Sequence, residues 1–176
     1  LREGVLDRGT PAPWAMVIFG ATGDLTRRKL VPALYNLAHE GQLPAGFTVV
    51  GVARRPKSHD EFRAELRQAV DQYSRFRPVN PAVWEALAQG VFYHQADFGD
   101  AAGFDRLRER LVKLDGERGT AGRRLFYLAT APDDFPTIIN RLGASGLARR
   151  EGAGASSQRV IVEKPFGHSE ATARAL

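Results

Sequence analysis

Residues 17–30, VIFGATGDLTRRKL, decide the fold class of this chain. The apolar run over 14–19 is typical of a buried strand, and Gly20 and Gly23 follow it directly. Beyond the glycines, Leu30, Leu34 and Leu37 recur at the spacing of one helix face. A strand, a glycine turn and a helix in this order indicate the first unit of an alternating α/β fold.

Pro32 lies inside this helical pattern, where a proline lacks the N–H donor and clashes with the preceding turn. Either the helix kinks at Pro32, or Pro32 takes an early helix position after an irregular turn. Gly41 is the expected stop of the helix.

The rest of the chain alternates strand and helix patterns. Apolar runs predict further strands over 47–53, 91–95, 125–130 and 159–164. Helical periodicity predicts helices from an Asp60 cap to residue 76, from an Asn80 cap to Gly90, over 100–115 and after Pro132. The segment 115–124, DGERGTAGRR, reads as a loop, and a last helix follows Ser169.

Five strands separated by helices predict a doubly wound α/β domain, with a mainly parallel sheet and helices on both faces. Ligands of such sheets bind outside the carboxyl ends of the strands. The segments after the five strands are FGATGD, ARRPK, ADFGD, TAPDDF and EKPFG, which are rich in glycine, proline and charge. We therefore expect the binding site at this edge of the sheet.

Composition limits the class of protein. The chain has 176 residues, no cysteine and a net charge of +5, which suits one soluble domain over 13–176 after an irregular tail over 1–12. It shows no bilayer-spanning run, no signal peptide and no metal-site pattern, and a cytoplasmic location fits. The chain begins without Met and ends within a helix pattern, so we expect a fragment of a longer protein.

The positive charge makes nucleic acid a candidate partner. However, the basic residues are interspersed with acidic ones, and ordinary solvated helix faces account for most of the surplus. We expect no nucleic-acid partner.

The glycine turn is a candidate phosphate site. Gly20 permits a sharp turn, Gly23 lets backbone amides near the helix start approach an anion, and Thr22 adds a hydroxyl. The full dinucleotide fingerprint is absent, because Thr22 and Leu25 occupy its second and third glycine positions, and the Walker pattern is absent too. Asp24 reads as a helix cap, or as a partner of one of the cations over 27–29.

The end of the second strand indicates the cofactor. NAD enzymes usually have an acidic residue there to bind the ribose hydroxyls. Here Arg54 and Arg55 occupy that place, with Lys57 beyond them. Arginine suits the additional phosphate of NADP, through paired hydrogen bonds and charge. The sequence therefore predicts NADP as the cofactor.

The segments GATGDLTRRKLVPALYNL, GVARR, LFYLATAP and VIVEKPFG occur in this order and together resemble the glucose-6-phosphate dehydrogenase family over nearly the whole chain. The resemblance implies a Rossmann-type NADP domain. It implies a parent enzyme that oxidises glucose 6-phosphate to 6-phosphogluconolactone with hydride transfer to NADP, the first step of the pentose phosphate pathway. It also implies a homo-oligomer assembled through a larger carboxyl-terminal domain outside this chain.

The resemblance assigns roles to particular residues. It implies cofactor contacts at Gly20, Ala21, Thr22, Gly23, Asp24, Leu25, Arg54, Asp97, Phe98, Ala129 and Thr130. Lys164 matches a lysine that contacts both the cofactor and the sugar phosphate, where it would orient the C1 hydroxyl. A cis peptide bond before Pro165 is expected.

One departure concerns the catalytic base. The family's RIDHYLGK motif and its base histidine lie downstream of EKPFG, and neither occurs here. His39, His59, His94 and His168 lack a carboxylate at suggestive spacing and are no substitutes. We expect this chain to hold the cofactor with little or no turnover. The alternative is a complete, non-catalytic NADP-binding or regulatory module.

Overall fold

A computed structural model describes residues 11–148, 158–165 and 169–174. Its centre is a five-stranded sheet in the order β3-β2-β1-β4-β5, and every neighbouring pair is parallel. The strands are β1 (Ala15–Phe19), β2 (Thr48–Ala53), β3 (Val91–Gln95), β4 (Arg124–Leu128) and β5 (Gln158–Val162). This order, with β1 between β2 and β4, confirms the predicted doubly wound parallel sheet.

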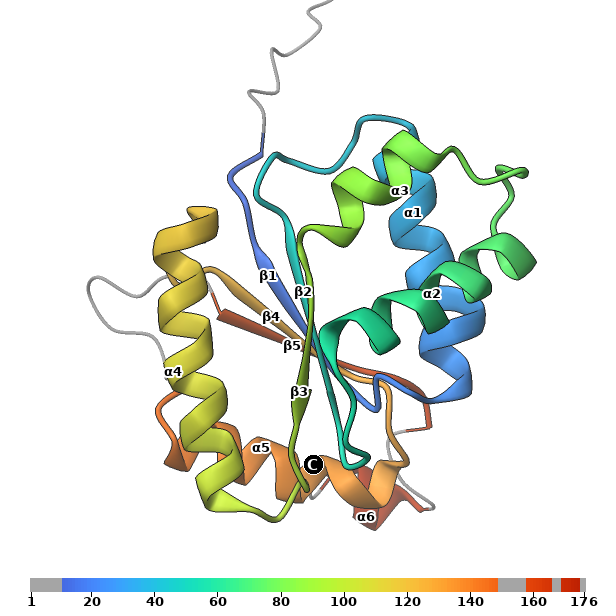
Figure 1. The fold of residues 1–176 in the computed structure, drawn as a ribbon. Coiled ribbons are helices and arrows are strands. Elements are labelled where there is room, and N and C mark those ends of the chain that lie inside the picture. The colour runs from blue at the N-terminus through green and yellow to red at the C-terminus, as the bar shows by residue number, and fades with distance from the viewer. Residues whose placement is uncertain (1–10, 149–157, 166–168, 175–176) are drawn as a thin grey trace, which may run out of the picture.

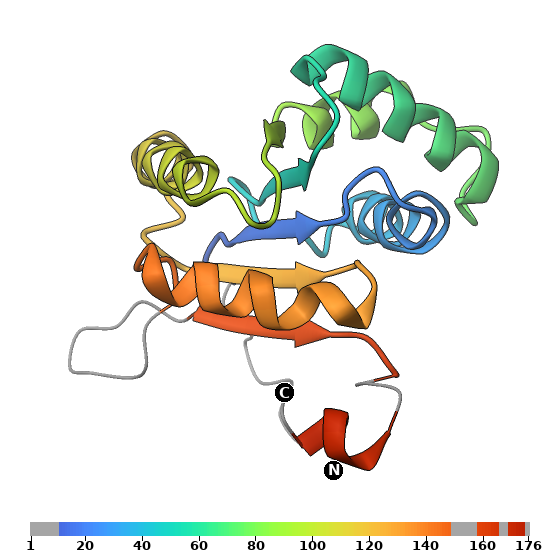
Figure 2. The same cartoon turned by 90° about the horizontal axis from the view of Figure 1, so that it is seen from below.

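Helices cover both faces of the sheet (Figures 1 and 2). One face carries α1 (Val31–His39), α2 (His59–Tyr73) and α3 (Pro81–Ala88), and the other carries α4 (Ala101–Arg118) and α5 (Phe135–Ala144). The remaining helical elements are the π-helical turn η1 (Thr26–Leu30), the 3₁₀ turn η2 (Pro132–Asp134) and the short α6 (Glu170–Arg174).

The two layers explain why the strands read as continuous apolar runs. Successive side chains of β1 point to opposite faces, so Met16 and Ile18 pack against α1, α2 and α3. Val17 and Phe19 pack against α4 and α5 instead. Each fully buried side chain of this size stabilises the fold by about 1.5–3 kcal/mol.

The turn η1 settles the position of Pro32. The helix leaves the glycine turn through η1, in which the Val31 amide donates to the Thr26 carbonyl, and Pro32 then occupies the first turn of α1. The early-position reading of Pro32 is therefore confirmed, because the irregular turn η1 precedes it and Pro32 lies in the first turn of α1.

Three predicted helix limits are wrong. Helix α2 ends at Tyr73, three residues before the predicted end at residue 76. The cap of α2 is Ser58 and not Asp60: the Ser58 hydroxyl accepts from the Glu61 amide, and the Glu61 carboxylate accepts from the Ser58 amide. Helix α4 continues through part of the expected loop to Arg118 and ends at Gly119, whose φ of 70° is left-handed.

A polar cluster joins the end of α4 to the start of β4. The Asp115 carboxylate accepts from the Thr120 hydroxyl at 2.6 Å, from the Gly122 amide at 2.9 Å and from the Arg124 guanidinium at 2.6 Å. Arg124 is buried. This cluster holds the chain in helical form beyond Leu114 and orients the turn into β4.

Side chains of α2 reach the outer strand β3. The His59 Nδ1 accepts from the Tyr93 amide at 3.0 Å, and the Arg63 Nε donates to the Val91 carbonyl at 2.9 Å. Two backbone groups of β3 that face away from β2 are thus hydrogen-bonded.

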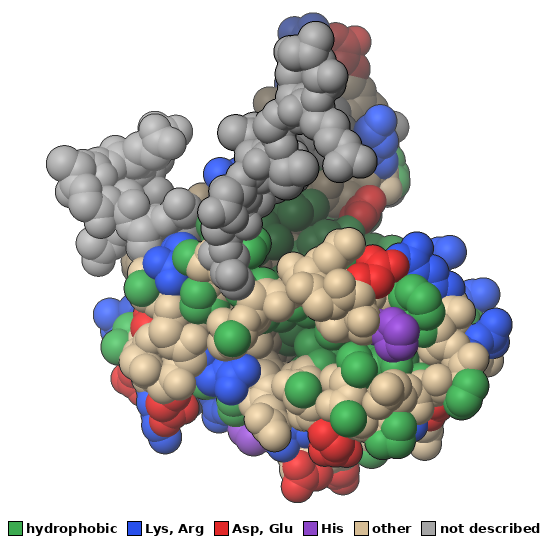
Figure 3. All heavy atoms as spheres, turned by 90° about the horizontal axis from the view of Figure 1, so that it is seen from above, with side chains coloured by type: hydrophobic (Ala, Val, Ile, Leu, Met, Phe, Trp, Pro, Cys, Tyr) green, Lys and Arg blue, Asp and Glu red, His purple; other side chains and the backbone are tan. Residues whose placement is uncertain are grey.

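The amino ends of the strands carry an apolar hollow of about 500 Å³. It lies between the loop over 43–47 and helix α3. Figure 3 views the molecule from this side and shows basic and acidic side chains interspersed rather than gathered in one basic patch.

Candidate functional site

A pocket of about 270 Å³ lies at the carboxyl ends of the strands, where the sequence predicts the site. It is lined by Gly20, Thr22, Gly23, Ala53, Arg54, Arg55, Phe98, Thr130 and Asp134. These residues lie at or just after the carboxyl ends of β1, β2, β3 and β4, so the parallel sheet gathers them from four strand ends. The glycine turn and the arginines after β2 face one cavity.

The glycine turn packs its backbone tightly against β4. Gly20 has a φ of 80°, and a Cβ there would lie 2.4 Å from the Ala129 carbonyl oxygen. The Gly23 amide donates to the Gly20 carbonyl at 2.9 Å, and a Cβ on Gly23 would lie 3.1 Å from that oxygen. A side chain at Gly20 would push the turn away from Ala129, and a side chain at Gly23 would crowd the carbonyl of Gly20.

The helix after the turn presents its amino end to the pocket. The first N–H groups of a helix have no partner within it and carry a partial positive charge. The buried Thr26 donates its hydroxyl proton to the Gly20 carbonyl at 3.1 Å, which ties this helix end to the turn. The exposed Asp24 carboxylate pairs with Arg28 at 3.3 Å, as in the second reading of Asp24, and the structure gives it no capping contact within the described residues.

The loop after β2 is held by side chains of β3. The Tyr93 hydroxyl donates to the Arg55 carbonyl and lies 3.3 Å from the Ala53 carbonyl, and the Gln95 amide donates to the Arg54 carbonyl at 3.2 Å. Burial raises the pKa of Tyr93, and Glu65 raises it further, so its hydroxyl keeps its proton. The loop backbone is therefore anchored, while both arginine side chains are exposed.

Neither guanidinium of this loop forms an ion pair with a carboxylate in the part of the chain that the structure describes. Arg54 and Arg55 thus bring uncompensated positive charge to the pocket. A phosphate group is the kind of ligand that such a pair binds by charge and by several hydrogen bonds.

Other residues expected at the cofactor lie around the pocket rather than in its lining. Ala21 is buried in the core under the turn, and Leu25 packs partly against that core. Asp97 lines a larger neighbouring groove that shares Arg54. Ala129 meets the turn through its carbonyl, as described above, whereas Phe98 does line the pocket, edge-on to Phe19 at 6.0 Å.

Lys164 follows β5 and is exposed, and it is not among the residues that line the pocket. The peptide bond between Lys164 and Pro165 is cis, as expected. The preceding residue, Glu163, accepts a hydrogen bond from the Tyr127 hydroxyl of β4. Burial and this carboxylate raise the pKa of Tyr127 to about 12, so the contact persists across the physiological range.

The three described histidines contact the framework of the fold. His94 is buried, its Nε2 lies 2.9 Å from the Gly103 carbonyl, and burial lowers its pKa. His39 stacks on Phe76 at 4.1 Å, His59 contacts β3, and His168 lies outside the described residues. Within the described ranges, no group of acidic or histidine side chains suits a metal ion.

Sequence reasoning missed Asp134, which lines the pocket, and Thr26, whose hydroxyl contacts the glycine turn. Asp134 could have been found from its place in TAPDDF, the segment that follows β4. In the structure it lies in η2 and lines the pocket. Thr26 could have been found as the polar side chain nearest the glycines in the new helix.

These features fit a dinucleotide. Two glycines in the pocket lining carry no side chain, a helix begins beside them, and two arginines without carboxylate partners lie across the same pocket. No helix in the described ranges combines the length and hydropathy needed to cross a membrane.

The comparison with known proteins supports this fit. A family model described as "Glucose-6-phosphate dehydrogenase, NAD binding domain" matches residues 17–176. Glucose-6-phosphate 1-dehydrogenase of Chlamydia muridarum is 52% identical over 165 residues, which are 93% of this chain and 32% of that protein. Glucose-6-phosphate 1-dehydrogenase 2 of Mycobacterium tuberculosis is 47% identical over 164 residues, 93% of this chain and 31% of that protein.

Solved structures agree. The crystal structure of glucose-6-phosphate 1-dehydrogenase from Mycobacterium avium superimposes with a TM-score of 0.76 at 31% identity, covering 94% of this chain and 32% of that one. A glucose-6-phosphate dehydrogenase in complex with glucose-6-phosphate gives a TM-score of 0.80 at 30% identity, covering 95% of this chain and 34% of that one.

The chain spans about a third of the length of the curated relatives it matches. These findings do not favour a non-catalytic module complete in itself, because the matched region is one part of a longer enzyme in each relative. The chain belongs to the glucose-6-phosphate dehydrogenase family, in which it corresponds to the NAD binding domain.

Proposed function

We propose that this chain is the coenzyme-binding part of a cytoplasmic glucose-6-phosphate 1-dehydrogenase, with a tail over 1–12 and a domain over 13–176. The whole enzyme would oxidise glucose 6-phosphate to 6-phosphogluconolactone with hydride transfer to NADP, and would assemble as a homo-oligomer through a domain outside this chain. The names of the relatives and the substrate complex of a structural neighbour support the activity. The observation that carries the proposal is the single pocket lined by both the glycine turn and Arg54.

NADP rather than NAD is the proposed cofactor. The amides around Gly23 would bind the pyrophosphate, and Arg54, with Arg55 beside it, would bind the additional phosphate of NADP. One hydrogen bond to a charged group contributes about 1.5–3 kcal/mol, which corresponds to ten- to more than a hundredfold in affinity. The anchored backbone of the loop supports this role, because it reduces the entropy lost on binding.

The proposed roles of the remaining residues follow from their places. NADP, when bound, supplies a nicotinamide ring that accepts a hydride from the sugar. Ala129 and Thr130 would line the nicotinamide side, and Asp97 and Phe98 would lie beside the cofactor. Lys164 would hold the C1 hydroxyl or the phosphate of the sugar in position. The base that removes the hydroxyl proton would come from outside this chain, so the chain alone would bind NADP without turnover.

Calorimetric titration of the chain with NADP and with NAD tests the proposal. We expect Arg54→Ala to weaken NADP binding at least tenfold while changing NAD binding little, because only NADP carries the additional phosphate. Arg108→Ala is the matched control: it removes an exposed arginine of α4 that pairs with Asp105 at 3.9 Å, and it should leave both affinities unchanged. Equal losses of NADP and NAD affinity in Arg54→Ala would contradict the assignment.

A further inference from the structure

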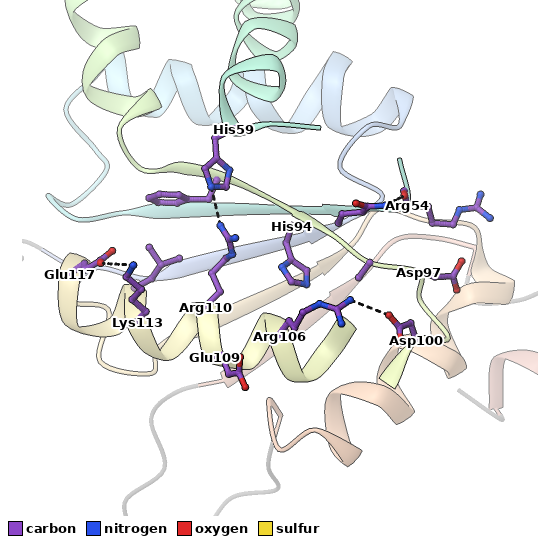
Figure 4. Close-up of a pocket in the computed structure, with 14 residues that line it drawn as sticks. Arg54, His59, His94, Asp97, Asp100, Arg106, Glu109, Arg110, Lys113 and Glu117 are labelled. Carbon is purple, nitrogen blue, oxygen red and sulfur yellow. Dashed lines mark hydrogen bonds and ion pairs between the residues drawn. The ribbon is translucent and has the colours of Figure 1, made fainter. Parts of the chain in front are cut away.

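A second concave site adjoins the cofactor pocket. It is a groove of about 1040 Å³ that runs along β3 and α4, with Arg54 near one end and Arg110 and His59 farther along (Figure 4). Its other cationic lining residues are Arg106 and Lys113. The proposed function gives roles to Arg54 and Asp97 at one end of this groove, and none to Arg110 and His59.

Two of the four cations that line the groove are already neutralised by ion pairs. Arg106 pairs with Asp100 at 3.3 Å, and Lys113 pairs with Glu117 at 3.6 Å. Arg110 forms no ion pair with any carboxylate among the described residues. Its sequence neighbour Glu109 also lines the groove, but it forms no ion pair with Arg110 in the described part of the chain (Figure 4). Arg110 therefore brings an uncompensated charge to the middle of the groove.

The contact of Arg110 with His59 lacks an acceptor. The backbone amide of Tyr93 can only donate, so His59 Nδ1 must accept its hydrogen bond at 3.0 Å. A neutral imidazole with an acceptor Nδ1 carries its proton on Nε2. That Nε2 lies 3.0 Å from Nη1 of Arg110, which also only donates. Two N–H donors thus face each other at hydrogen-bond distance.

Protonation of the ring does not relieve this mismatch. It would leave Nε2 a donor and would turn Nδ1 into a second donor, directed at the Tyr93 amide. Burial lowers the pKa of His59, and the charges of Arg110 and Arg63 lower it further against the opposing effect of Asp60. The ring stays neutral in positive surroundings, and an acceptor that carries negative charge would satisfy both donors.

We propose that the phosphate group of a small phosphorylated metabolite binds between His59 Nε2–H and the Arg110 guanidinium, in a site separate from the cofactor pocket. Phosphate oxygens can accept from both donors at once, and the neighbouring groove has room for the rest of such a molecule. Inorganic sulfate and inorganic phosphate are suitable probes, because both are tetrahedral oxyanions.

The test is an NMR titration of the histidine ring signals of the chain with sulfate or phosphate, against sodium chloride at equal ionic strength. We expect a saturable shift of the His59 signals with a dissociation constant on the order of 1 mM, as two charge-assisted hydrogen bonds can supply. Arg110→Gln should weaken this binding at least tenfold. Arg108→Gln, an exposed arginine on the same helix, should leave it unchanged.

Two further variants keep the result decisive. Arg54→Ala should retain the His59 shift if the site is separate from the cofactor pocket. Amide spectra show whether Arg110→Gln folds. If Arg110→Gln does not fold, Arg110→Lys replaces it in the test, and this variant should retain part of the affinity because it keeps the charge. The proposal is overturned if no saturable shift exceeds that of chloride, or if Arg54→Ala removes the shift while Arg110→Gln preserves it.

Discussion

Asp115→Ala is expected to be among the most destabilising single changes in the part of the fold that the structure describes. Its carboxylate accepts from Thr120, Gly122 and Arg124, and the Arg124 side chain is only 7% exposed. Removal of the carboxylate leaves the Arg124 guanidinium buried without an ionic partner. Breaking a buried ion pair on one side typically costs about 3–5 kcal/mol. We expect the free energy of unfolding to fall by that amount.

Urea unfolding followed by circular dichroism measures this loss, and a thermal scan provides a second reading. For a chain of this size, the expected loss corresponds to a decrease in Tm of about 6–20 °C. Asp105→Ala is the control on the same helix, because its ion pair with Arg108 is exposed and long at 3.9 Å. An exposed pair of this kind contributes about 0–1 kcal/mol.

A double variant identifies the cause of the loss. Asp115→Ala combined with Arg124→Met removes the buried charge together with its partner, so part of the lost stability should return. If Asp115→Ala costs no more than Asp105→Ala, the guanidinium finds another partner or water, and the assigned role of this cluster is wrong.

Three further predictions concern the turn, a cap and a histidine. Gly20→Ala should destabilise the fold by more than Gly41→Ala in urea unfolding. Both glycines have a left-handed φ, in which an alanine costs about 1–2 kcal/mol. Only the Cβ at Gly20 would also meet a carbonyl oxygen, at 2.4 Å. Equal losses would show that β4 can move away. Ser58→Ala should lower the free energy of unfolding by about 0.5–2 kcal/mol, and Asp60→Ala should lower it less, because Ser58 makes the capping contact. A larger loss in Asp60→Ala in the same assay would show that Asp60 is the cap. Because burial lowers the pKa of His94 below its ordinary 6.5, its contribution to stability is complete above that pH and is lost as pH falls through the lowered pKa. Unfolding free energies measured across this range should depend less on pH in His94→Gln, and an unchanged dependence would remove His94 as the cause.

The strands and the main helices were predictable because a sheet that is buried on both faces requires continuous apolar runs in its strands. Every strand except β5 is largely buried, and an apolar run between polar ends indicates such a strand without knowledge of its neighbours. The order of the strands was not in the pattern, because alternation alone does not say which strands are neighbours. The cap at Ser58 could also have been predicted, because Glu61 follows it by three residues, as in a capping box. Asp60 was chosen instead because its side chain is also a common helix cap.

The misplaced end of α4 has a tertiary cause. Gly116 and the polar residues around it favour a loop, because glycine costs about 1 kcal/mol within a helix. The contacts of Asp115 with Gly122 and Arg124 outweigh that preference, and they join residues that local sequence does not relate.

The position of the pocket followed from the parallel sheet, whereas its lining did not. The turn over 20–25 was expected to contact a cofactor as a whole, yet its backbone path sends Ala21 into the core and leaves Gly20, Thr22 and Gly23 at the surface of the pocket. The contact between His59 and Arg110 joins two helices that pack on different faces of the sheet, so no local pattern reveals it.

The side chains that α2 extends over β3 also bear on solubility. An outer strand with unpaired amides and carbonyls can recruit a strand from another molecule and start aggregation. On β3 the Tyr93 amide and the Val91 carbonyl are already engaged by His59 and Arg63, so strand addition there would first have to displace both. Substitutions of these two residues would therefore lower the yield of soluble protein more than their small effect on the core suggests.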